Sequence, residues 1–145
     1  MLAAAATGAV GGLIGHLALN ALRRVAAGVL MKLSVKARGG AAAVRTGQAG
    51  EAAVRAKYDI GKRERYTIDN RDRISDGSTD EVISEVKNVA RLSYTQQIKE
   101  IETRAANTGR SIDLYVRGGD NPTKLSAPLL EAIAKNDRFN LKEIP

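Results

Sequence analysis

The feature that most constrains this chain is an abrupt change of composition near residue 45. Residues 1–44 are dominated by Ala, Gly, Leu and Val, whereas residues 45–145 mix apolar, polar and charged side chains in ordinary proportions. A chain of 145 residues has room for one domain and a short extension. The sequence therefore predicts a helical Ala/Gly-rich extension or linker over residues 1–44 and a domain over residues 45–145.

The first 22 residues carry no formal charge, and that length is sufficient for a helix to cross a bilayer. Gly8 and Gly12 have the spacing of small residues in packed membrane helices. The first basic residue, Arg23, follows the apolar run, whereas a signal peptide carries its basic residues in front of it. Membrane contact through residues 1–30 therefore stays open as the alternative to a linker.

The net charge of +7 invites a polyanionic partner, but the charge is unevenly distributed. Residues 1–46 hold six basic residues and no acidic one, whereas residues 47–145 hold 17 basic and 16 acidic residues. The basic excess thus belongs to the extension, where it suits a membrane surface, a nucleic-acid backbone or an acidic partner. The basic excess is therefore no evidence that the domain over residues 45–145 binds nucleic acid.

Several kinds of chemistry are excluded by residues that are missing or rare. The chain has no Cys, which excludes disulfides, thiolate zinc sites and a cysteine nucleophile. Its one histidine, His16, lies in the apolar N-terminal run, so histidine metal sites and Ser-His-Asp catalysis have no support. With no Trp and one Phe, Phe139, the chain lacks the aromatic residues for a base-stacking platform.

Hydrophobic periodicity and turn signals predict a mixed α/β sheet with local connections. Ser93 and Gln96 have the spacing of a helix capping box, and Gly109 is placed to end that helix. The expected elements, in chain order, are a helix over residues 46–58 capped by Thr46, strands over 65–70, 71–76 and 81–88, a helix over 93–108, a strand over 111–117, a helix over 126–135 and an edge strand over 139–144.

The residues that suit catalysis lie close together in this predicted sheet. Glu85 and Lys87 are two apart on one strand, so both side chains leave the same face. A hairpin with the preceding strand would bring Asp76 next to Glu85. Two neighbouring carboxylates repel unless a cation lies between them, so a hard divalent metal is expected there. Lys87 would then lie beside the water and the phosphate of a hydrolysis reaction.

This pattern resembles the motif of the PD-(D/E)XK, or restriction-endonuclease-like, nucleases. The wider context is similar to the restriction-endonuclease-fold toxin domains at the C-termini of bacterial polymorphic toxins. Six segments carry the resemblance, which extends over about residues 47–145: Gly47–Glu51 (GQAGE), Arg73–Gly77 (RISDG), Glu85–Asn88 (EVKN), Leu92–Gln97 (LSYTQQ), Leu114–Arg117 (LYVR) and Thr123–Ser126 (TKLS).

The resemblance implies the α-β-β-β-α-β core already expected from the periodicity, and it assigns roles to five residues. Glu51 is the acid carried by the first helix, and Asp76 takes the metal-binding aspartate position. Glu85 and Lys87 take the last two positions of the motif. The metal ligands are therefore expected to be Glu51, Asp76 and Glu85, with Gln97 near the active site or the nucleic-acid backbone.

Two departures and one arginine cluster complete the expected site. Ser75 stands where the family usually has Pro, which shapes the turn and does no chemistry. Asp80 is the alternative to Asp76 as metal ligand if the hairpin register differs. A solvated surface and, as the alternative, contacts to nucleic acid are expected at four arginines around the first hairpin: Arg63, Arg65, Arg71 and Arg73.

The resemblance implies a metal-dependent endonuclease with Mg²⁺, or alternatively Mn²⁺, as its ion. The expected activity is that of a DNase toxin domain of an interbacterial effector, exported to the target-cell cytoplasm and neutralised by an immunity protein. RNA as substrate and the oligomeric state stay open. One alternative is a housekeeping or defence nuclease in the cytoplasm of its own cell. Another is a membrane-active protein that works through its N-terminal apolar segment.

Overall fold

The computed structural model describes residues 40–145, and residues 1–39 are outside the description. The chain divides into two compact units, Met1–Ala42 and Ala43–Pro145, of which the second is the domain considered below. The predicted membrane contact through residues 1–30 falls outside the described residues. Within residues 40–145, no helix combines the length and the apolar character that a membrane span requires.

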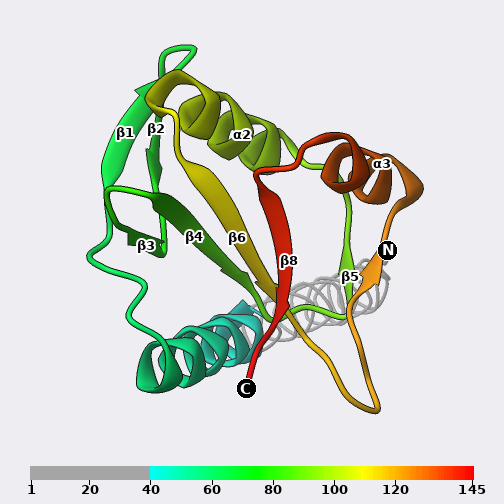
Figure 1. Ribbon diagram of the computed structural model, residues 1–145. Coiled ribbons are helices and arrows are strands. Elements are labelled where there is room, and N and C mark those ends of the chain that lie inside the picture. The colour runs from blue at the N-terminus through cyan, green and yellow to red at the C-terminus, as the bar shows by residue number, and fades with distance from the viewer. Residues whose placement is uncertain (1–39) are drawn as a thin grey trace, which may run out of the picture. The chain divides into compact units, whose positions relative to one another are not determined.

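The domain contains three helices and eight short strands within the described residues (Figure 1). A helix over residues 40–57 comes first. The other elements are β1 (Arg65–Ile68), β2 (Arg71–Ile74), β3 (Gly77–Ser78), β4 (Val82–Lys87), β5 (Arg91–Leu92), α2 (Gln96–Thr108), β6 (Ser111–Val116), β7 (Lys124–Leu125), α3 (Ala127–Lys135) and β8 (Phe139–Glu143). This order confirms the expected mixed α/β fold class.

A four-stranded sheet forms the centre of the domain, with the order β3-β4-β6-β8. β3 runs antiparallel to β4, whereas β6 runs parallel to both β4 and β8. The interior strands β4 and β6 are buried over most of their length, as strands covered on both faces are. β8 lies at the edge of the sheet, as its sequence predicted.

Two hydrophobic clusters cover the two faces of this sheet. One joins alternate residues of β4 and β6, such as Ile83 and Leu114, to Ile98 of α2 and Leu129 of α3. The other joins Val86 and Tyr115 to Val54, which lies on the helix over residues 40–57, and to Ile60. The domain therefore has three layers, with helices on both sides of the sheet. Glu85 and Lys87 alternate with Val86, so they face the α2 side.

The first hairpin differs from its prediction in where its strands end. Asp69 and Asn70 were expected to continue the first strand, but both have positive φ, of 48° and 60°, between β1 and β2. A type I′ two-residue hairpin turn requires positive φ at both central positions, and Asp and Asn tolerate it best after Gly. The turn chemistry of this pair therefore overrides the β-propensity of the run before it.

The hairpin expected between residues 71–76 and the next strand is also wrong. β2 pairs with β1, and β3, a two-residue strand that was not predicted, pairs with β4 instead. Two helix starts differ as well. The first described helix already runs at residue 40, so Thr46 does not cap it. The cap of α2 is Thr95, whose hydroxyl accepts from the Ile98 N–H at 3.4 Å, and not the expected Ser93.

Candidate functional site

Asp76 is positioned by the antiparallel pairing of β3 with β4. Gly77 lies opposite Ser84, so one step further along the same register Asp76 lies opposite Glu85. Gly77 has no room for a side chain, because a Cβ there would lie 2.4 Å from the Ile60 carbonyl oxygen. Asp76 Oδ2 accepts a hydrogen bond of 2.8 Å from the Val86 N–H. Strand pairing and a side-chain hydrogen bond together fix this carboxylate beside the middle of β4.

Glu85, Lys87 and Gln97 form a closed hydrogen-bonded triad between β4 and the first turn of α2. Glu85 Oε1 accepts from Lys87 Nζ at 2.5 Å and from Gln97 Nε2 at 2.7 Å. Lys87 Nζ also donates to Gln97 Oε1 at 3.1 Å. Glu85 is only 2% exposed, which makes it one of the most buried acidic residues in the described part of the chain. Each side chain of the triad thus orients the other two.

The second oxygen of this carboxylate, Glu85 Oε2, is buried and has no hydrogen-bond partner among residues 40–145. Burial is the main reason that the pKa of Glu85 is raised to about 7, with a smaller contribution in the same direction from the Asp76 carboxylate and an opposing one from Lys87. Burial likewise raises the pKa of Asp76. A buried unpaired oxygen costs free energy unless something binds it. A hard divalent cation held by one or two carboxylates fits this donor set.

Glu51 lies near Asp76, but its own oxygens are engaged. Arg55 Nε donates to Glu51 Oε1 at 3.0 Å, and Arg63 forms a second ion pair with it. Burial alone would raise the pKa of Glu51, but the hydrogen bonds from Arg63 and Arg55 bring it below its usual value. Within residues 40–145, no three His, Cys, Asp or Glu side chains meet as a metal-binding group. Glu51 therefore lies near Asp76 with its carboxylate paired to two arginines, and its role as a metal ligand stays a prediction.

Arg55 is the site residue that the sequence analysis missed. Its guanidinium donates to the Gly61 carbonyl at 2.8 Å and to the Asp76 carbonyl, as well as to Glu51. It therefore ties the first described helix to the backbone of the residue that precedes β3. One signal was available in the sequence, because Glu51 and Arg55 are four residues apart on a helix and face each other. The tertiary contacts of Arg55 left no trace in the sequence.

The four arginines predicted to contact nucleic acid each have an acidic neighbour in the structure. Arg71 and Arg73 both pair with Glu100, a buried residue of α2 that is 1% exposed. Arg63 pairs with Glu51, and Arg65 lies 3.9 Å from Asp72 with both side chains largely exposed. A buried carboxylate requires such partners. Arg71 and Arg73 therefore neutralise an acid of the core, and the nucleic-acid role of this cluster stays a prediction.

Asp80 and Ser75 were singled out in the sequence, and both lie near the ends of β3. Asp80 is exposed in the turn between β3 and β4, whereas Asp76 lies opposite Glu85, so the observed register favours Asp76. Ser75 is fully buried, and its N–H donates to the Glu64 carbonyl at 3.0 Å. Its hydroxyl accepts from the Glu64 N–H at 3.2 Å. A proline at this position would lack the N–H of the first bond.

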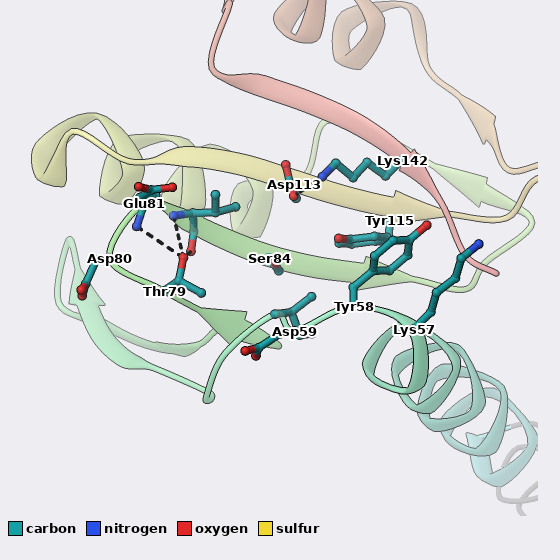
Figure 2. A pocket seen from close by; sticks show the side chains of 12 residues that line it. Lys57, Tyr58, Asp59, Thr79, Asp80, Glu81, Ser84, Asp113, Tyr115 and Lys142 are labelled. Carbon is teal, nitrogen blue, oxygen red and sulfur yellow. Dashed lines mark hydrogen bonds and ion pairs between the residues drawn. The ribbon is translucent and has the colours of Figure 1, made fainter.

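A depression of about 680 Å³ lies on the face of β4 opposite the triad (Figure 2). Tyr58 and Tyr115 line it, with their ring centroids 5.7 Å apart. Lys142 Nζ donates to Asp113 Oδ2 at 2.6 Å beside them, from the neighbouring strand β8. Its lining residues include none of the triad and not Asp76. The candidate site and this depression are therefore separate features.

The three-layer fold and the Asp-Glu-Lys arrangement at β3 and β4 define a restriction-endonuclease-like domain. Residues 47–129 match the family model described as restriction endonuclease fold toxin 7. This match covers more than half of the chain, and the chain belongs to that family. No curated protein and no solved structure matches the chain significantly. Membership indicates a nuclease toxin and confirms the resemblance found in the sequence motifs.

Proposed function

We propose that the domain is a Mg²⁺-dependent endonuclease that hydrolyses phosphodiester bonds, with DNA as its expected substrate. The observation that carries this proposal is the buried Glu85 Oε2, which has no partner among the described residues and lies in a triad with Lys87 and Gln97. Asp76 lies opposite Glu85 in the strand register. A carboxylate pair with a free oxygen can bind the metal ion of phosphodiester hydrolysis, and an adjacent ammonium can stabilise the negative charge that develops on the phosphate.

In this proposal Asp76 and Glu85 hold the metal ion, and Mn²⁺ is the alternative to Mg²⁺. When bound, the ion supplies electrostatic stabilisation of the phosphate and an acidified water. Lys87 Nζ donates a hydrogen bond to the negative charge that develops on the phosphate oxygens. Gln97 holds both Glu85 and Lys87 in place through its amide oxygen and nitrogen. Glu51 is a positioning residue that acts through Arg55 on the backbone of Asp76.

We also propose that residues 45–145 are the toxin domain of an interbacterial effector and that residues 1–44 join it to the rest of the effector. The family description, a toxin of the restriction endonuclease fold, supports this role. An exported nuclease would act in the cytoplasm of the target cell, and its producer would need an immunity protein. Expression in a host without that protein distinguishes this role from that of a nuclease that serves its own cell. The effector hypothesis predicts toxicity and rescue by a neighbouring gene product.

The test of the activity is incubation of the purified chain, free of any immunity protein, with plasmid DNA and with RNA. We expect cleavage of DNA in Mg²⁺, no cleavage in EDTA, and none by Lys87→Ala. Lys135→Ala is the matched control, because Lys135 is exposed and pairs with Glu131 on the same helix. Intact DNA and intact RNA in every Mg²⁺ or Mn²⁺ reaction of the wild type would refute the proposed function.

A further inference from the structure

Three of the motif segments contribute residues that the nuclease centre does not use. Asn88 ends the EVKN segment, Arg117 ends LYVR, and Lys124 lies within TKLS. In the structure these segments meet around a depression of about 690 Å³, lined by Ala90, Arg91, Arg117, Asp120, Asn121, Pro122 and Lys124. All of these residues belong to the part of the chain that matches the family. The depression therefore gathers residues that were singled out by sequence and still lack a role.

Two of its cations are set side by side by strand pairing. β5 and β7 run parallel, with Arg91 opposite Lys124 and Leu92 opposite Leu125. Leu92 and Leu125 face the main hydrophobic cluster, so the alternation of side chains sends Arg91 and Lys124 out to solvent together. Like charges directly opposite each other in a sheet are destabilising on their own. An anion bound between them would remove that cost.

The third cation, Arg117, is held by two hydrogen bonds to Asn88. Arg117 Nε donates to Asn88 Oδ1 at 2.5 Å, and its Nη2 donates to the Asn88 carbonyl at 2.8 Å. The loop that follows is closed at its base, because Thr123 N donates to the Arg117 carbonyl at 3.1 Å. Thr123 Oγ1 in turn donates to the Val89 carbonyl at 2.7 Å. The guanidinium is therefore oriented by Asn88, the residue that directly follows β4 and Lys87.

The charge of the depression is not compensated by ion pairs. Arg91, Arg117 and Lys124 form no salt bridge with any of residues 40–145, and Asp120 is the one acid of the lining. Residues 1–39 contain no Asp or Glu that could supply one. The four arginines around the first hairpin, in contrast, all have acidic neighbours. Within residues 40–145, the three cations of this depression, Arg91, Arg117 and Lys124, thus lie together without acidic partners.

We propose that Arg91, Arg117 and Lys124 form a binding site for the backbone phosphates of the nucleic acid that the nuclease centre cuts. This inference rests on the proposed function. β5 connects the two elements of that centre, since it lies four residues after Lys87 and leads into α2, which carries Gln97. A guanidinium fork and an ammonium suit phosphate oxygens. The site holds the nucleic-acid strand beside the metal-binding carboxylates without recognising its base sequence.

The experiment measures binding of labelled duplex and single-stranded oligonucleotides to the full chain, by fluorescence anisotropy between about 50 and 200 mM NaCl. Lys87→Ala is the non-cleaving parent. We expect Arg91→Ala/Lys124→Ala in that parent to weaken binding and to lower the slope of log affinity against log salt by about 2, one unit for each lost phosphate contact. Both residues are exposed, so the variant is expected to fold, and a thermal melt verifies this.

The matched control, Lys135→Ala/Arg138→Ala, removes the same number of positive charges at the opposite end of the sheet, beside the start of β8. An unchanged slope for the control together with a reduced slope for the test variant supports the proposal. Equal slopes for the two variants overturn it, and cleavage by the wild type then still stands. Absence of both cleavage and binding refutes the proposed function itself.

An acidic protein is the competing occupant of the same cations. Poly-glutamate serves as the probe for it, in the same titration and with the same variants. Stronger binding to DNA or RNA than to poly-glutamate supports the phosphate site. If poly-glutamate binds the parent as tightly as nucleic acid does, and Arg91→Ala/Lys124→Ala reduces only that binding, the site belongs to an acidic protein and the proposal fails.

Discussion

Two clusters of buried or half-buried acids in the domain are built from similar residues and behave in opposite ways. Glu64 accepts from Arg110 at 2.7 Å, from Ser78 at 2.6 Å and from Arg104, so both of its oxygens are paired. Glu85 has one paired oxygen and one buried oxygen without a partner among the described residues. The hydrogen bond from Arg110 brings the pKa of Glu64 down to about 2, whereas burial raises that of Glu85 to about 7.

This difference in pairing means that Glu64 stabilises the fold, whereas Glu85 lowers its stability. The Glu64 cluster connects β3, the start of β6 and α2 through Ser78, Arg110 and Arg104, which fastens the strand that follows Asp76. In the Glu85 cluster, one carboxylate oxygen is buried and has no partner in the described part of the chain, which costs stability. Proteins retain such features where a ligand binds. The first cluster thus holds in place the strand that positions the second.

The largest expected effect is on catalysis, from Lys87→Ala. Removing the ammonium takes away the group that faces the developing negative charge, so cleavage should fall roughly 10²–10⁴-fold. The free energy of unfolding should also fall, because Lys87 pairs with the buried Glu85, but the loss of cleavage should persist under conditions in which the variant is folded. Cleavage rates and urea titrations of the same preparation check both statements. A variant that cleaves at the wild-type rate would remove Lys87 from the mechanism.

Glu64→Gln should lower the free energy of unfolding and leave cleavage by the folded protein intact. It removes the charge that pairs with Arg110 and Arg104, and hydrogen bonds to charged groups contribute about 1.5–3 kcal/mol each when buried partners are left behind. We expect a loss of free energy of unfolding in that range, with cleavage by the folded protein retained at low temperature. A fully stable but inactive variant would erase the distinction between the two clusters.

The pH dependence of stability offers a narrower test of the Glu64 cluster. The folded-state pKa of about 2 lies below the ordinary value of 4.5, so the stabilisation is complete above about pH 4.5 and is lost as the pH falls towards 2. The difference in unfolding free energy between wild type and Glu64→Gln should therefore shrink over that interval. Urea titrations at a series of pH values measure it, and a constant difference would contradict the assignment.

The smallest effect is expected from Gln97→Ala. The glutamine makes hydrogen bonds to Glu85 and Lys87, but it carries no charge and holds no metal in our proposal. Loss of a hydrogen bond to a charged group costs about 1.5–3 kcal/mol, which corresponds to roughly a tenfold to hundredfold lower cleavage rate. Gln96→Ala, one residue away, is the control. A loss as large as that of Lys87→Ala would give Gln97 a direct role.

Much of the fold could be predicted from the sequence because its signals are local. The alternation in β4, the apolar run of β6 and the Gly109 terminus of α2 each report their own element. β5 and β7 could not be predicted, because each has two residues and exists only through pairing with the other. β3 was missed for the same reason, and with it the strand that pairs Asp76 with β4.

The candidate site was predictable where residue spacing carries it and unpredictable where burial decides it. The two-residue spacing of Glu85 and Lys87 gave the shared face. Nothing local shows that Glu100 is buried in the core, although this explains why Arg71 and Arg73 are paired. The same applies to Arg55, whose partners at Gly61 and Asp76 follow from tertiary packing. Charge pairing between distant segments is the information that a single sequence lacks.

The central claim is that Glu85 Oε2, which is buried without a partner among residues 40–145, is a ligand of a divalent cation. Thermal melts of wild type and Glu85→Gln with and without Mg²⁺ test it most directly, with Glu64→Gln as the control. A ligand at 100 times its dissociation constant adds about 2.7 kcal/mol to stability. We predict that Mg²⁺ raises the melting temperature of wild type and of Glu64→Gln but not that of Glu85→Gln. An equal rise in all three proteins, or none in the wild type, would contradict the claim.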